Sequence, residues 1–254
     1  MSSHVCAGVD GCKAGWVVVR RAPGEAPEVR VVADFAALLD ALPDTAIVAV
    51  DMPIGLPDRA GAGGRGPEAL VRRHLGQRQS SVFSIPSRRA VHAEPGPFSG
   101  VEDWYAAHRR ASAVARETSD PPRGVSIQAF GIFSKIREID ALMIARPELR
   151  MRVIESHPEA AFWRLNDSEA MSLPKKVKGG VNAPGMEERR GLLSRHGLSR
   201  AFLEAAPPRG AASDDYLDAC AMLLVAERHA RGETVPFPDP PLADAYGIPV
   251  AIWT

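Results

Sequence analysis

Short apolar runs near the start of the chain predict a meander of three strands. Residues 5–9 and 16–19 flank a glycine-containing segment, which is typical of a β-hairpin. Valines at 29–33 indicate a third strand. Residues 46–50 are apolar at every position and end at Asp51, which predicts a strand covered on both faces.

Helical patterns dominate most of the remaining chain. The first helix is expected at 35–42, with Asp34 as its N-cap and Pro43 after it. Further helices are predicted at 67–75, 101–117, from about 132 to before 147, from 156, at 187–196 and at 200–205. A fifth strand is predicted at 151–155 and a last one at 246–253. A mobile, glycine- and arginine-rich segment is expected at 58–66.

The late helix at 213–231 carries the clearest amphipathic pattern. Ser213 is its expected N-cap. An apolar stripe is formed at steps of three and four residues by Leu217, Cys220, Ala221 and Leu224. This order of strands and helices predicts an α/β fold with a mixed sheet flanked by helices. We expect one domain over 1–254, with a helical insertion at about 58–148 and the fourth strand parallel to the first and beside it.

Composition narrows the functional classes only modestly. The chain has 254 residues, of which 45% are hydrophobic and 24% charged, and its formal net charge is +0. No overall field therefore draws it to nucleic acid or to an anionic membrane, and any such binding needs a local patch. Three cysteines without metal-ligand spacing indicate reduced thiols. Because no apolar stretch fits a signal peptide or a membrane span, we expect a cytoplasmic protein without a membrane partner.

Acidic residues stand where the predicted strands end. Asp10, Asp51 and Glu155 close the first, fourth and fifth strands. Because active sites in open α/β sheets gather beside the carboxyl ends of strands, these acids are expected to meet there. Carboxylates without histidine or cysteine ligands favour Mg²⁺ or Mn²⁺. A turn aspartate that bonds its own backbone is the simpler alternative for Asp10 alone.

The late helix adds further acids in its first turns. Asp214, Asp215 and Asp218 lie one turn apart or less. Acids in a first helical turn also suit the helix dipole, which accounts least well for Asp218 beside the apolar stripe.

Basic and serine-rich loops supply candidate substrate contacts. Arginine and serine at 76–89, and lysine at 174–180, suit phosphate oxygens. The candidate substrate-binding residues are Lys13, Arg78, Ser81, Arg88, Lys135 and Lys175. The alternatives are a solvated charged face for 76–89, a surface pair for Lys135 with Glu138, and a capping or core role for His157.

The order of elements and several motifs resemble known proteins. The chain resembles the ribonuclease H-like fold, and DYLDA at 215–219 is similar to the late-helix signature of Holliday-junction resolvases. It more closely resembles predicted ribonuclease H-like nucleases described as domain of unknown function 429. The matching segments are GVDGCKAGW at 8–16, VAVDMPIGLP at 48–57, LGQRQSSVFSIPSR at 75–88, QAFGIFSKIREID at 128–140, ESHPE at 155–159 and DDYLDA at 214–219.

That resemblance implies a set of metal-binding, catalytic acids. The set is Asp10, Asp51, Glu155, Asp215 and Asp218. Helix phase alone places Asp214 nearer the apolar stripe than Asp215, so the choice between these two stays open. The implied activity is a divalent-metal-dependent nuclease with two ions, Mg²⁺ or Mn²⁺, acting on DNA or RNA. The alternatives are a phosphotransferase or ATPase of the actin and sugar-kinase type, and a non-catalytic binding or scaffold protein.

Overall fold

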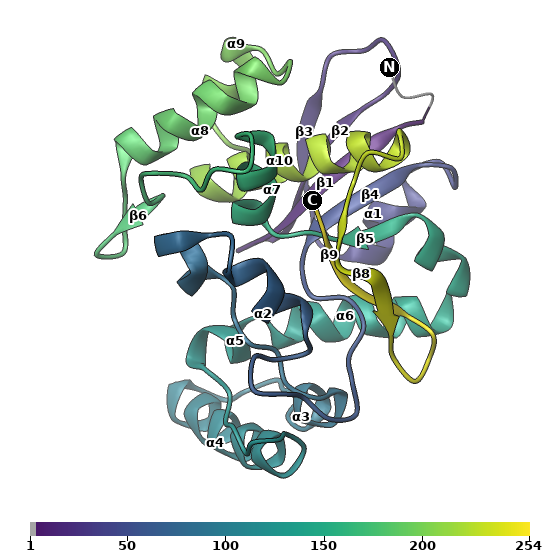
Figure 1. Ribbon diagram of the computed structural model, residues 1–254, viewed down its shortest axis with the longest axis vertical. Coiled ribbons are helices and arrows are strands. Elements are labelled where there is room, and N and C mark those ends of the chain that lie inside the picture. The colour runs from purple at the N-terminus through teal and green to yellow at the C-terminus, as the bar shows by residue number, and fades with distance from the viewer. Residues whose placement is uncertain (1–3) are drawn as a thin grey trace.

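A five-stranded mixed sheet forms the centre of the molecule (Figure 1). The computed structural model describes residues 4–254. The sheet has the order β3-β2-β1-β4-β5, with antiparallel pairing among the first three strands and parallel pairing of β4 with β1 and β5. The strands are β1 (Cys6–Cys12), β2 (Gly15–Arg21), β3 (Glu28–Val32), β4 (Ile47–Asp51) and β5 (Val153–Glu155). The predicted place of the fourth strand, parallel to the first and beside it, is confirmed.

Helices cover both faces of this sheet. Because side chains alternate along a strand, Val18 faces one core and Val17 the other. One core lies against α1 (Phe35–Asp40) and α6 (Phe133–Ala145), and the other against α10 (Ser213–Ala230). The remaining helices of the second face are α7 (Pro158–Leu165), α8 (Ala183–Arg195) and α9 (Arg200–Glu204).

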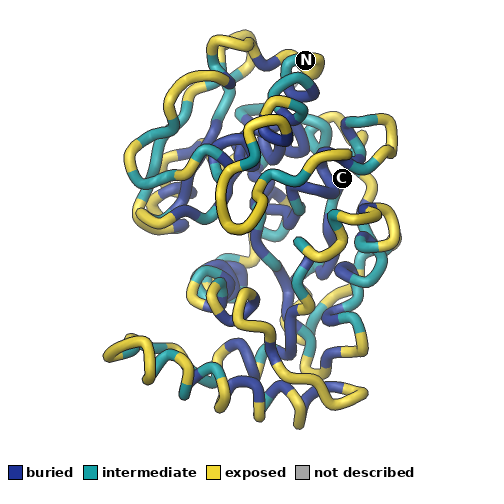
Figure 2. The backbone as a smooth tube through the Cα atoms, turned by 90° about the vertical axis from the view of Figure 1, so that its left-hand side faces the viewer, coloured by how far each residue is buried: buried dark blue, intermediate teal, exposed yellow. Residues whose placement is uncertain are grey.

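A helical segment between β4 and β5 forms the lower part of the molecule in Figure 1. It comprises α2 (Pro67–Arg72), the 3₁₀ helix η1 (Gly76–Ser81), α3 (Arg88–His92), α4 (Val101–Glu117), α5 (Ile127–Gly131), α6 and the 3₁₀ helix η2 (Pro147–Met151). Alanines of α4 belong to the same buried cluster as the valines of β1 and β4, so this segment shares its core with the sheet. Figure 2 shows this buried interior, with exposed turns around it.

Two short hairpins complete the fold. One joins β6 (Lys176–Val177) to β7 (Gly180–Val181), and the other joins β8 (Pro236–Ala243) to β9 (Pro249–Trp253). The predicted last strand is therefore present as β9, but it pairs with β8 in a separate sheet. No helix within residues 4–254 is both long and apolar enough to cross a membrane.

The helix α10 packs unusually close to β1 because β1 has a glycine at the contact. A Cβ atom added at Gly8 would lie 1.9 Å from the backbone nitrogen of Leu223 and 2.2 Å from the carbonyl oxygen of Ala219. All four residues of the predicted apolar stripe are buried in this contact. The glycine thus fixes how deep α10 lies against the sheet.

Two local expectations are wrong. Ser213 is the first residue of α10, and the cap is Ala212, whose N–H donates to the Asp215 carboxylate at 2.9 Å. Lys135 and Glu138 form no surface pair, since Glu138 accepts a hydrogen bond from the Trp16 indole at 3.1 Å. The mobility expected for 58–66 stays a prediction, although the Arg65 side chain in this segment is fully buried and bonded.

Candidate metal centre

Two aspartates stand side by side at the ends of neighbouring parallel strands. Asp10 of β1 and Asp51 of β4 are register partners. Because β1 and β4 run parallel and the two acids are in register, both side chains lie at the same edge of the sheet. Asp10 is buried, and its Oδ1 accepts a hydrogen bond from the Gly11 N–H at 2.6 Å.

The helix α10 brings a third carboxylate to this pair. Its apolar stripe lies on the sheet, which directs Asp218 toward the strand ends. Asp10, Asp51 and Asp218 each offer one carboxylate oxygen, and these oxygens all lie within 4.8 Å of one another. Of the five acids expected from the sequence, the structure gathers these three.

Burial and mutual repulsion raise the pKa values of these carboxylates. Burial raises the pKa of Asp10 well above its usual value, and the charges of Asp51 and Asp218 raise it further. The same causes, burial first, raise the pKa of Asp51 to about 8. Burial raises the pKa of Asp218 to about 6, although Lys175 opposes the rise. The cluster therefore holds fewer than three negative charges at neutral pH unless a cation enters it.

Two lysines of the β6 segment lie against the acids of α10. The Lys175 ammonium bonds Oδ2 of Asp218, and the Lys176 ammonium lies 2.6 Å from Oδ2 of Asp214. The other oxygen of each carboxylate, Oδ1, is buried and has no hydrogen-bond partner among the described residues. Leaving a carboxylate oxygen buried and unpaired is costly. These two oxygens are therefore open to a ligand.

The three gathered carboxylates suit a small divalent cation. Mg²⁺ binds oxygen ligands at about 2.0–2.1 Å, so oxygens on opposite sides of it lie about 4.2 Å apart. The three carboxylate oxygens, within 4.8 Å of one another, are close to this spacing. An all-oxygen donor set also favours Mg²⁺ or Mn²⁺ over softer metals. The residues present thus fit one such ion, held by Asp10, Asp51 and Asp218.

The other expected acidic ligands have different partners. Both oxygens of Glu155 contact the Arg65 guanidinium, at 2.5 and 2.9 Å, and Oε2 also accepts the Ile54 N–H. Asp215 caps α10, whereas Asp214 is the more buried of the two, as helix phase predicts. The structure therefore does not assemble a second set of carboxylates around Glu155 or Asp215.

Two of the candidate phosphate-binding lysines lie close to the acids. Lys175 contacts Asp218 directly. Lys135 lines the cavity beside Asp10 and donates to the Gly15 carbonyl, with its ammonium 4.3 Å from the Trp16 ring centroid. Burial lowers the pKa of Lys135. Lys13 lies nearby in sequence, exposed in the turn after β1.

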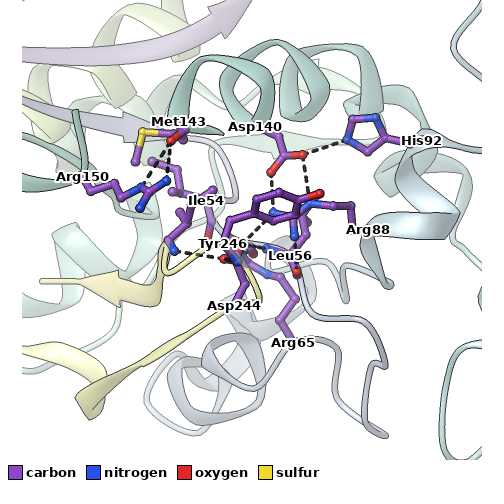
Figure 3. A network of polar contacts seen from close by, with 12 residues as sticks. Ile54, Leu56, Arg65, Arg88, His92, Asp140, Met143, Arg150, Asp244 and Tyr246 are labelled. Carbon is purple, nitrogen blue, oxygen red and sulfur yellow. Dashed lines mark hydrogen bonds and ion pairs between the residues drawn. The ribbon is translucent and has the colours of Figure 1, made fainter. Parts of the chain in front are cut away.

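The remaining candidates lie in or after η1. Ser81 lines the same cavity, and its hydroxyl donates to the Arg78 carbonyl at 2.8 Å. Within residues 4–254 the Arg78 guanidinium forms a single hydrogen bond, to its neighbour Gln77 at 3.4 Å. Arg88 is bound inside the protein, 2.7 Å from Asp140 and 2.6 Å from Asp244 (Figure 3). Its donors are directed at these partners and away from the acidic cluster.

Some residues of the site were not singled out from the sequence. Arg65 is the clearest case, because its burial depends on Glu68 and Glu155, 3 and 90 positions away. His157 caps α7 by accepting the Glu159 N–H at 3.2 Å, as the capping alternative predicts, but it also lines the cavity. Burial lowers its pKa to about 4, so the ring is neutral near pH 7.

Comparison with known proteins places the chain in a family without assigning an activity. No curated protein matches the chain, and no solved structure does. The family match covers residues 8–243, which include every candidate acid. The chain belongs to the family described as "Protein of unknown function (DUF429)".

Proposed function

We propose that this protein is a ribonuclease H-like, divalent-metal-dependent nuclease that hydrolyses phosphodiester bonds of DNA or RNA. The observation that supports it is the convergence of Asp10, Asp51 and Asp218 at one edge of the sheet. Their burial and raised pKa values show that three negative charges repel one another there, and Lys175 offsets this repulsion only in part, so a divalent cation would stabilise the ionised cluster. The family resemblance and the order of the strands agree with this choice.

The chain's own residues bind and orient the phosphate in this proposal. The three carboxylates hold Mg²⁺ or Mn²⁺, which would lower the pKa of a bound water and neutralise charge on the phosphate. Lys175 and Lys135 lie on two sides of the acids and balance charge there. Ser81 adds a hydroxyl at the cavity wall. Because only three acids converge, the proposal rests on one ion at this location.

The proposed partner is nucleic acid, bound by local contacts. A net charge of +0 excludes a strong overall attraction to polyanions, so affinity must come from residues around the site. The proposal includes a cytoplasmic location and no membrane partner.

Metal binding by the wild type and Asp10→Asn tests the proposal. Calorimetry with Mn²⁺ should show one site in the wild type and at least ~100-fold weaker binding in Asp10→Asn, since one charged ligand is lost. Asp58→Asn is the control, because Asp58 is an exposed acid outside the cluster. Labelled DNA and RNA should be cut only by proteins that bind the metal.

Other outcomes point to the other classes. Absence of Mn²⁺ binding at millimolar concentration would favour a scaffold role. Tight ATP binding with slow hydrolysis, in a protein that cuts neither DNA nor RNA, would favour a phosphotransferase or ATPase.

A further inference from the structure

A cavity of about 190 Å³ opens beside the acidic cluster. Asp10 and Asp51 form part of one wall, so a group bound in the cavity lies next to the candidate metal position. The apolar part of the lining includes Phe83, Ile132 and Ile252, and Lys135 is among its charged residues. Pockets for drug-sized ligands are about 300 Å³ or more, so this cavity suits a single flat ring system.

Phe83 differs from every other aromatic residue in the described chain. Each other Phe, Tyr and Trp within residues 4–254 contacts another ring or a cationic side chain. Phe83 has no such contact and is only half-buried, with one side packed against the core. Its free face lines the cavity, where a flat ligand can stack on it.

A second cavity, of about 530 Å³, adjoins the segment that carries Phe83. The two cavities share Val82, Phe83 and Ile85 in their walls. The larger one has a polar lining that includes Ser80 and Arg123. The Arg123 guanidinium is exposed and forms no ion pair within residues 4–254, so it is available to an anion such as a phosphate.

We propose that these two cavities bind consecutive unpaired nucleotides of a single-stranded nucleic acid, with one base stacked on Phe83. This inference rests on the proposed nuclease function, because it places the phosphate of that nucleotide at the carboxylate cluster. A base stacks on an aromatic side chain whatever its identity, so the site accepts any sequence. The Watson–Crick pairs of a duplex cannot enter a cavity sized for one ring system, and duplex substrates are therefore disfavoured.

The acidic cluster and the two cavities together form a path for a short single-stranded segment. The acidic cluster suits a metal-bound phosphate, the small cavity suits a base, and the polar cavity with Arg123 suits the next nucleotide. A site for a free mononucleotide would need only the acidic cluster and the small cavity. The additional polar cavity therefore favours a polymer over a mononucleotide.

Binding of small probes separates the contribution of the base to affinity from that of the phosphate. With Mn²⁺ present, the wild type should bind thymidine 5′-monophosphate at least 10-fold more tightly than inorganic phosphate. Phe83→Ala and Phe83→Leu should each reduce that preference about 5-fold or more, and Phe83→Leu keeps an apolar side chain against the core. Tyr105→Ala removes an exposed ring on α4 and should change nothing. A nucleotide preference unaffected by both Phe83 variants would overturn the base site.

Oligonucleotides in a chelating buffer, where no cleavage is expected, test the path itself. A 12-nucleotide single strand should bind at least 10-fold more tightly than the blunt duplex of the same sequence. Arg123→Ala should weaken oligonucleotide binding and leave thymidine monophosphate binding unchanged. Equal affinity for single strand and duplex would overturn this inference. A wild type that binds the single strand but no Mn²⁺ would instead overturn the proposed nuclease function.

Discussion

Asp10 and Asp51 are neighbours in register across the parallel strands β1 and β4, and Asp10 is buried whereas Asp51 is half-buried. Neighbouring strands lie about 4.8 Å apart, so two ionised carboxylates at this spacing repel strongly. A buried pair of this kind must bind protons, a lysine or a metal ion. The stability and the metal affinity of the protein should therefore depend on whether protons, a lysine or a metal ion neutralises the pair.

The first prediction is that the metal-free protein loses stability as the pH rises. The folded-state pKa values of Asp51 and Asp218 are raised to about 8 and about 6, whereas both are near 3.8 in ordinary surroundings. Folding therefore takes up protons, and the stability from these groups is complete below about pH 4 and is lost as the pH rises toward 8. Each unit of pKa difference corresponds to about 1.4 kcal/mol. Urea unfolding with a chelator, between pH 5 and pH 8.5, measures this loss.

Removing one acid provides the control for that measurement. Asp10→Asn should flatten the decline between pH 5 and pH 8.5 and raise the stability of the metal-free protein at pH 8, because one repelling carboxylate is gone. Saturating Mn²⁺ should flatten the same decline in the wild type. A wild-type stability that rises over this pH range would contradict the prediction.

The second prediction concerns Arg88 at the start of α3, which forms ion pairs with α6 and with the turn after β8 (Figure 3). Its guanidinium contacts the buried carboxylates of Asp140 and Asp244 and stacks on the Tyr246 ring, 4.6 Å from the centroid. Arg88→Ala leaves these acids buried without their cation, which costs about 3–5 kcal/mol in comparable pairs. Thermal and urea unfolding should show this loss.

Arg89 gives a matched control for Arg88. It pairs with Glu117 at 3.3 Å, and both side chains are largely exposed. Arg89→Ala should therefore change the free energy of unfolding by less than about 1 kcal/mol. If Arg88→Ala left stability unchanged but weakened nucleic-acid binding, a substrate role for Arg88 would be restored.

The positions of the first strands along the chain were predictable because they depend on local patterns. The apolar runs of β1, β2 and β4 and the proline after the first helix each mark an element within a few residues. The convergence of Asp10, Asp51 and Asp218 follows from the strand order together with the apolar stripe of α10. Hydrophobic periodicity marked these elements, and the order of the elements along the chain supplied the expected pairing of β1 with β4.

The partners of the charged side chains were not predictable from the sequence in the same way. Arg65 binds Glu155 and Arg88 binds Asp244, over separations of 90 and 156 residues. A Gly- and Arg-rich segment has the same composition whether its arginine is solvated or buried. Pairings over such distances depend on tertiary packing, which no local periodicity encodes.

The third prediction tests how deep α10 must lie against β1. Gly8→Ala places a methyl group against the backbone of Leu223, where no side chain can rotate away. Because α10 carries Asp218, its displacement should destabilise the protein by at least about 3 kcal/mol and weaken Mn²⁺ binding. Gly191→Ala in α8 is the control, since nothing lies within 4 Å of the added methyl group. This helical change should stabilise the protein by about 0.5–1 kcal/mol. Equal stabilities of the two variants would contradict the close packing at Gly8.

The last prediction is that Lys175 competes with a divalent ion for Asp218. Burial lowers the pKa of Lys175, but the neighbouring charges of Asp218, Glu159 and Asp51 raise it more, so the ammonium stays charged. Lys175→Met removes this cation and keeps the length and apolar volume of the side chain. Asp218 then has no cation bound to Oδ2, and Mn²⁺ affinity should rise about 10-fold or more.

Lys176 provides the comparison for Lys175, because it pairs with Asp214 and is half-exposed. Lys176→Met should change Mn²⁺ affinity less than threefold, since Asp214 lies outside the gathered carboxylates. Calorimetry at pH 7.5 measures both variants beside the wild type. The rise for Lys175→Met should shrink as the pH falls toward 6, because protons then bind the same carboxylates and replace the lysine as competitor. A weaker Mn²⁺ affinity in Lys175→Met would mean that the lysine supports the metal position instead of competing for it.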